Sequence, residues 1–120
     1  MTEKTINILG RDVRMKYCAA TETGFEKLTG KSINDISFSI QEDLITLALS
    51  AIVAAYARNG EEPPISSDDL LYDATPQDIV ELLRCVIELR AEWYGIPKVV
   101  ADELAKETED IDESEIEKNA

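Results

Sequence analysis

The sequence predicts a mainly helical α+β fold, in which an N-terminal β-hairpin packs on a bundle of about four helices. Residues 5–17 alternate apolar and polar side chains around a turn that contains glycine, which is typical of a hairpin. Residues 41–58 are apolar almost throughout, and residues 76–94 repeat apolar side chains at helical spacing. A chain of 120 residues buries roughly two-thirds of its unfolded surface and needs no metal or disulfide to fold.

The hairpin is predicted from two short runs that each alternate in polarity. The turn is placed at Gly10-Arg11-Asp12. One face of the hairpin is apolar and the other carries basic residues, so we expect the apolar face to lie on the helices. The apolar positions are Ile6, Ile8, Val13, Met15 and Tyr17.

A short helix should follow the hairpin. Thr23 and Glu26 have the spacing of a capping box, and Thr21 is a competing cap. Phe25 and Leu28 are predicted to face inward.

The helix at 41–58 is predicted to begin with a capping box of Ser39 and Glu42 and to end at Asn59-Gly60. A helix that is apolar nearly all round is either the centre of a fold or part of an interface. Its narrow polar stripe is expected near Asp43, Thr46 and Ser50. Since a chain of this size has few elements to wrap such a helix, we take these of its residues as interface candidates: Leu49, Ile52, Val53 and Tyr56.

Two helices are predicted after the rigid loop at 61–64. A short one at 68–72 is capped by Ser66 or Ser67, and the last begins with Thr75 as cap and Pro76 at the first position. The inward face of the last helix is predicted as Ile79, Leu82, Leu83, Val86, Leu89 and Trp93.

Three residues near the end of that helix are further interface candidates. Trp93 and Tyr94 belong to types enriched at protein interfaces, or else Trp93 closes the core and Tyr94 is half exposed. Arg90 lies beside the apolar stripe, where it either extends to solvent or pairs with an acid across an interface.

The charge is strongly negative and uneven. The net charge is −13, and residues 102–120 hold nine acidic residues against two lysines. We therefore divide the chain into a domain at 1–100 and an acidic, mobile tail at 101–120. The charge disfavours nucleic acid and anionic membrane surfaces as partners.

The chain is expected to be cytoplasmic. Its N-terminus lacks the apolar run of a signal peptide, and its most apolar stretch, residues 44–57, is too short to span a bilayer. Cys18 and Cys85 are predicted to be free thiols.

No catalytic, cofactor or metal site is predicted. The chain contains no histidine, so the commonest general base and zinc ligand is missing. The acidic residues at 68, 69, 73 and 78 lack the spacing of a calcium loop and suit helix starts better. An enzyme is therefore disfavoured, and protein binding is the function class that remains.

The order of motifs resembles the tail assembly chaperones of long-tailed bacteriophages and prophages over about residues 5–95. It runs from the Gly10-Arg11 turn through Leu28-Thr29-Gly30-Lys31-Ser32-Ile33, the Ala/Leu-rich helix at 47–56 and Asp68-Asp69-Leu70-Leu71 to the closing amphipathic helix. The Gly-Lys-Ser run does not fit a phosphate-binding loop, since Gly24 lies one residue too early. The short first helix with Gly24 inside it departs from the family pattern.

This resemblance implies a role in building the phage tail. Such chaperones bind the long, apolar, helical tape measure protein while tail tube subunits polymerise around it. They are not retained in the virion, many self-associate, and many have a longer form made by ribosomal frameshifting. The alternative is an acidic phage- or plasmid-encoded regulator that mimics DNA or inhibits a basic partner, whose binding would fall steeply with salt.

Overall fold

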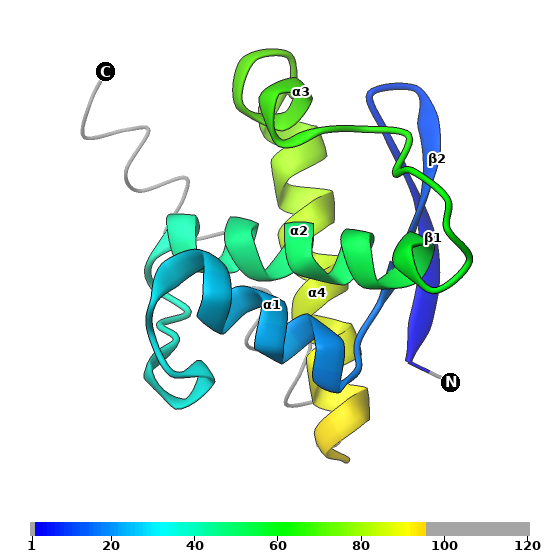
Figure 1. Cartoon of the computed structure of the whole chain (residues 1–120). Coiled ribbons are helices and arrows are strands. Elements are labelled where there is room, and N and C mark those ends of the chain that lie inside the picture. Colours follow the sequence, from blue (N-terminus) through cyan, green and yellow to red (C-terminus); the bar gives the residue numbers. More distant parts are fainter. Residues whose placement is uncertain (1, 96–120) are drawn as a thin grey trace, which may run out of the picture.

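The computed structural model describes residues 2–95, and in this range the predicted fold class is confirmed (Figure 1). The predicted domain end near residue 100 and the acidic segment 101–120 lie outside the described residues. In chain order, the elements are β1 (Glu3–Ile8), β2 (Arg11–Lys16), α1 (Ala19–Thr29), the 3₁₀ helix η1 (Ile33–Asp35), α2 (Gln41–Ala57), α3 (Ser67–Tyr72) and α4 (Pro76–Tyr94).

The hairpin turns more tightly than predicted. The strands are antiparallel, with Ile8 opposite Arg11, so that only Leu9 and Gly10 lie between them. Both residues have positive φ, 56° and 74°. Two positive φ values in a two-residue loop give a type I′ turn, whose twist matches that of the strands. The predicted turn, which extended to Asp12, was therefore wrong, because Arg11 and Asp12 are part of β2.

α2 is the centre of the fold. In Figure 1, α1 runs beside it, α4 crosses behind it, and the hairpin stands against one end. β2 packs on α2, and β1 packs on α4. The apolar face of the hairpin thus lies on helices, as predicted. The largest fully buried side chains come from all of these elements: Ile8, Val13, Met15, Tyr17, Phe25, Leu44, Leu47, Ile52, Leu82, Leu83, Val86 and Leu89.

The first helix begins earlier than predicted. It starts at Ala19, so the predicted capping box at Thr23 is not formed. The predicted alternative cap, Thr21, also lies inside the helix, whose N-cap is Cys18. The hydroxyl of Thr21 accepts from the backbone N–H of Cys18 (3.2 Å) and donates to the carbonyl of Lys16 (2.7 Å). These bonds join the end of the hairpin to the start of α1.

The predicted capping box of Ser39 is also wrong. α2 begins at Gln41 without a side-chain cap. The hydroxyl of Ser39 pairs with that of Ser37 (2.8 Å), and the backbone N–H of Ser37 donates to the carboxylate of Asp43 (3.3 Å). Asp43, in the first turn of α2, therefore fixes the loop that precedes the helix through this hydrogen bond.

The caps of the last two helices are confirmed. The hydroxyl of Ser66 accepts from the N–H of Asp69 at the start of α3, and that of Thr75 accepts from the N–H of Asp78 at the start of α4, each at 3.2 Å. α4 ends at Gly95, whose φ of 74° is the left-handed conformation common after a helix. None of the helices within residues 2–95 has the length and apolar character needed to cross a membrane.

Candidate functional site

The sequence predicted a polar stripe on α2 near Asp43, Thr46 and Ser50, and of these three only Thr46 is partly exposed. Asp43 and Ser50 are only 3% and 4% exposed. Each has a partner inside the fold: Asp43 accepts from Nζ of Lys31 (3.0 Å), and Ser50 donates to the carbonyl of Thr21 (2.6 Å). Since the polar side chains turn inward to bind these groups, apolar ones are left facing outward, and Val53 is 53% exposed.

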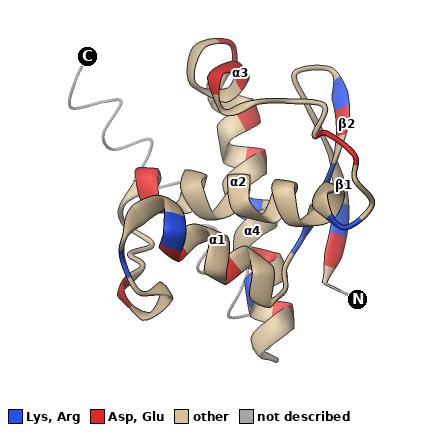
Figure 2. Ribbon diagram, viewed as in Figure 1, with Lys and Arg blue, Asp and Glu red and all other residues tan. Residues whose placement is uncertain are grey.

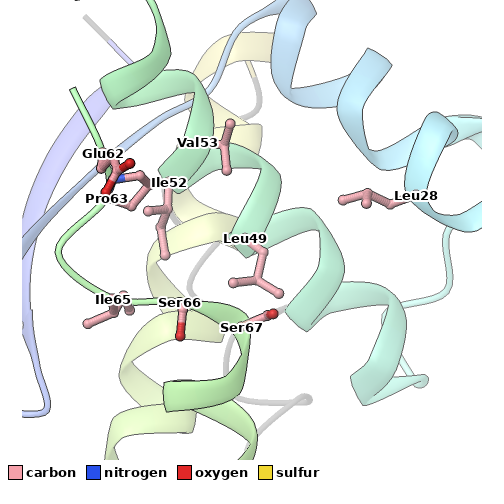
Figure 3. Close-up of a pocket in the computed structure, with 9 residues that line it drawn as sticks. All are labelled: Leu28, Leu49, Ile52, Val53, Glu62, Pro63, Ile65, Ser66 and Ser67. Carbon is pink, nitrogen blue, oxygen red and sulfur yellow. The ribbon is translucent and has the colours of Figure 1, made fainter. Parts of the chain in front are cut away.

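A groove of about 560 Å³ lies over this outward face (Figure 3). Figure 3 shows side chains of α2 along its floor, Leu28 of α1 on one side, and the segment before α3 on the other. The lining residues are Leu28, Leu49, Ile52, Val53, Glu62, Pro63, Ile65, Ser66 and Ser67. The lining is mostly apolar, and exposed apolar surface of this kind marks a candidate interaction site.

Leu28 lies in the groove wall and not in the core, contrary to the prediction. It is 67% exposed. The stripe of α1 that faces the core passes through Thr21 and Phe25, which are both fully buried, and reaches Thr29 next. Since successive residues of an α-helix are about 100° apart, Leu28 lies to one side of that stripe, towards the groove.

The interface candidates of α2 separate into two pairs. Leu49 and Val53 reach the groove from the outward face. Ile52 lines the groove floor but is only 1% exposed, and Tyr56 is buried. The ring of Tyr56 lies 4.5 Å from the guanidinium of Arg14, and its hydroxyl accepts from the N–H of that residue (3.0 Å). Ile52 and Tyr56 are thus core residues, and Tyr56 fastens the hairpin to α2.

The three candidates of α4 lie together at the end of that helix. The guanidinium of Arg90 stacks between the rings of Phe38 (5.2 Å) and Tyr94 (5.0 Å). Its Nε is buried and has no hydrogen-bond partner among the described residues. Trp93 contacts the ring of Tyr17 (5.5 Å) and is 39% exposed, so it covers the edge of the core without being enclosed by it.

A carboxylate joins this aromatic cluster to α1. Oε2 of Glu22 accepts from the hydroxyls of both Tyr17 (2.8 Å) and Tyr94. Burial, and then the hydrogen bond to Glu22, raise the pKa of Tyr17 above its ordinary value. The cluster therefore links α1 to the end of α4, and the rings of Trp93 and Tyr94 form its exposed aromatic edge.

The groove floor carries no charge, whereas the ends of the neighbouring elements do. Between residues 44 and 57 there is no charged side chain, and Figure 2 shows this stretch of α2 in tan. Acidic residues lie on α3 and on the loop before it, where Glu61 and Glu62 are adjacent in sequence (Figure 2).

Two of the four acidic residues considered for a metal, Asp69 and Asp78, act in helix capping. The backbone N–H of Ser66 donates to Asp69 (2.9 Å), and that of Thr75 donates to Asp78 (3.1 Å). These donors hold the pKa of both carboxyls below the ordinary value. Within residues 2–95, no group of three or more histidine, cysteine or acidic side chains is placed to hold a metal ion.

The Gly-Lys-Ser run after α1 has a structural role for each residue. Gly30 ends the helix with a φ of 72°. Lys31 pairs with buried Asp43, and the hydroxyl of Ser32 accepts from the N–H of Asn34 (3.3 Å) at the start of η1.

Sequence reasoning did not identify the walls of the groove. Periodicity placed Leu28 in the core, residues 61–64 were predicted as a surface loop, and Ser66 or Ser67 was predicted as a cap. The one available signal was Ile65 itself, a lone apolar residue in a polar loop.

The described residues define a small α+β domain with an apolar groove on its central helix and an aromatic edge at the end of α4. Comparison of the chain with protein-family models, with curated proteins and with solved structures finds no match.

Proposed function

We propose that this protein is a non-enzymatic binding factor, a tail assembly chaperone of a long-tailed phage or prophage. In this role it binds an apolar helical stretch of the tape measure protein in the host cytoplasm and is absent from the finished virion. The observation that carries the proposal is the groove over α2, whose floor is uncharged and includes the exposed side chain of Val53.

An apolar groove on a helical domain suits a helix as its occupant. Amphipathic helices bind such grooves by inserting apolar residues spaced three or four positions apart. On the groove floor, Leu49 and Val53 are four positions apart on α2, so they form an apolar strip against which such a helix can pack. Leu28 adds an apolar wall. A long apolar helix kept out of water in this way would not aggregate before the tail tube encloses it.

The negative charge of the chain supports the same role. At a net charge of −13, copies of the complex repel one another, which limits aggregation of an apolar cargo. The same groove would serve as the contact in a homo-oligomer of this chain, which would have to open before cargo binds.

The proposal is tested by co-expressing the full chain with a fragment of a phage tape measure protein and measuring the mass of the purified complex by light scattering. We expect a complex that persists in high salt, since apolar contacts are not screened. Val53→Glu should abolish it. Leu71→Glu is the matched control, because Leu71 is 68% exposed but is not a lining residue of the groove.

Two results would overturn the proposal. One is a complex that survives Val53→Glu unchanged. The other is binding that disappears in high salt, which would favour the acidic regulator instead.

A further inference from the structure

The two walls of the groove differ in polarity. Leu28 makes the α1 wall apolar, whereas the opposite wall combines Pro63 and Ile65 with the polar side chains of Glu62, Ser66 and Ser67. Figure 3 shows Leu28 and Glu62 on opposite sides of α2. An occupant with the same polarity along both edges would therefore match only one wall.

The charge on the polar wall is not neutralised within the fold. Glu61 pairs with Arg14 (2.8 Å), and Asp69 pairs with Arg11 (3.3 Å). Arg11 also donates to the carbonyl of Pro64 (3.0 Å). Among residues 2–95, Glu62 has neither a hydrogen bond nor an ion pair, and its side chain is exposed at the groove.

On the opposite side, Leu28 is the lining residue that α1 contributes, and it is apolar. Lys31, which follows α1, is already paired with Asp43. Among the lining residues, Glu62 is therefore the one that carries a charge.

We propose that the groove takes a single helix of a partner protein whose apolar stripe is bordered by Lys or Arg on the edge that faces Glu62. The choice of a helix as occupant rests on the proposed function, and the charge of its edge rests on Glu62. A second copy of this acidic chain fits this wall less well, since like charges repel.

The inference is tested with three helical peptides of about 20 residues, long enough to form isolated helices. They share one Leu/Ala stripe and carry Lys, Gln or Glu at both edges, and their affinities for the full chain are measured by fluorescence anisotropy. We expect the order Lys, Gln, Glu, with about a two- to fivefold step per exposed charge pair that shrinks in high salt.

Charge reversal at the wall supplies the decisive comparison. Glu62→Lys should reverse the preference between the Lys-edged and Glu-edged peptides and leave the Gln-edged affinity unchanged. Asp35→Lys is the matched control, since Asp35 is exposed in η1 and is not a lining residue, and it should keep the original order.

The two ideas fail in different ways. If Glu62→Lys leaves the preference unchanged while Val53→Glu abolishes binding, the groove remains the docking site and the charged edge is refuted. If none of the peptides binds the unmodified chain, both the edge and the groove as a helix site are refuted.

Discussion

The side chain of Ser50 occupies the place that a side chain at residue 24 would need. A Cβ atom on Gly24 would lie 2.3 Å from Oγ of Ser50, which real structures do not tolerate. That hydroxyl is fixed in position by its 2.6 Å bond to the carbonyl of Thr21. The glycine inside α1 therefore allows α1 and α2 to approach closely.

This contact predicts a non-additive pair of substitutions. Gly24→Ala should lower the free energy of unfolding by about 1–3 kcal/mol, because overpacking outweighs the better helix propensity of alanine. Ser50→Ala should cost about 1 kcal/mol through the lost hydrogen bond. The double variant should be more stable than Gly24→Ala alone, since the remaining Cβ of residue 50 lies 3.5 Å away. Urea denaturation measures all three, and strict additivity would refute the steric explanation.

Neighbouring residues of α2 should respond in opposite ways to the same substitution. Ile52→Glu places an unpaired charge in the core and should cost several kcal/mol, roughly 3–5, which is enough to unfold a marginal domain. Val53→Glu should leave the thermal midpoint nearly unchanged, because the side chain is half exposed. Circular dichroism melting curves distinguish the two. Equal destabilisation would mean that Val53 is enclosed in solution.

Glu22 should stabilise the fold through Tyr17. Glu22→Ala leaves the hydroxyl of the fully buried Tyr17 without its acceptor, at a cost of about 1–3 kcal/mol. In a Tyr17→Phe background the same substitution should cost much less. Tyr94→Phe should have little effect, since that side chain is 48% exposed. The double-mutant cycle is read from chemical denaturation, and a coupling near zero would contradict this assignment.

Asp78 should contribute to the loss of stability in acid. The N–H of Thr75, and then that of Leu9, depress the pKa of Asp78 below its ordinary value in the folded state. Its contribution to stability is therefore present above the unfolded pKa and lost as the pH falls through the folded pKa. Between about pH 5 and pH 2, Asp78→Asn should lose less stability than the unmodified chain. Parallel slopes of unfolding free energy against pH would refute this.

Cys85 should be unreactive in the native state. It is 4% exposed, and burial raises the pKa of its thiol to about 12. Because the thiolate is the nucleophile, a thiol reagent at pH 8 should modify Cys18, which is partly exposed, well before Cys85. Mass spectrometry of peptides after timed labelling separates the two sites. Rapid labelling of Cys85 under native conditions would show that α4 opens easily.

The fold was predictable where a pattern repeats along one element. Alternation identified the hairpin, and helical spacing identified the inward residues of α4 from Leu82 to Leu89. The caps of Ser66 and Thr75 were also correct, because each acts on a backbone N–H three residues away. Such short-range interactions are encoded locally and need no knowledge of the rest of the chain.

The site was less predictable because it depends on contacts between elements. Sequence reasoning named Leu49 and Val53 together with Ile52 and Tyr56, since an apolar helix gives no sign of which side meets the core. It also predicted Leu28 in the core and Asp43 and Ser50 on the surface, whereas Leu28 is exposed and the other two are buried.

The sequence by itself therefore determined the class of fold, the positions of α2, α3 and α4 to within a residue or two, and the acidic character of the chain. Only the tertiary structure decided which face of α2 is open. The reason is that Asp43 and Ser50 find partners at Lys31 and Thr21, which are 12 and 29 positions away along the chain. Once those polar groups are satisfied inside, the apolar face with Leu49 and Val53 is the one that remains for a partner.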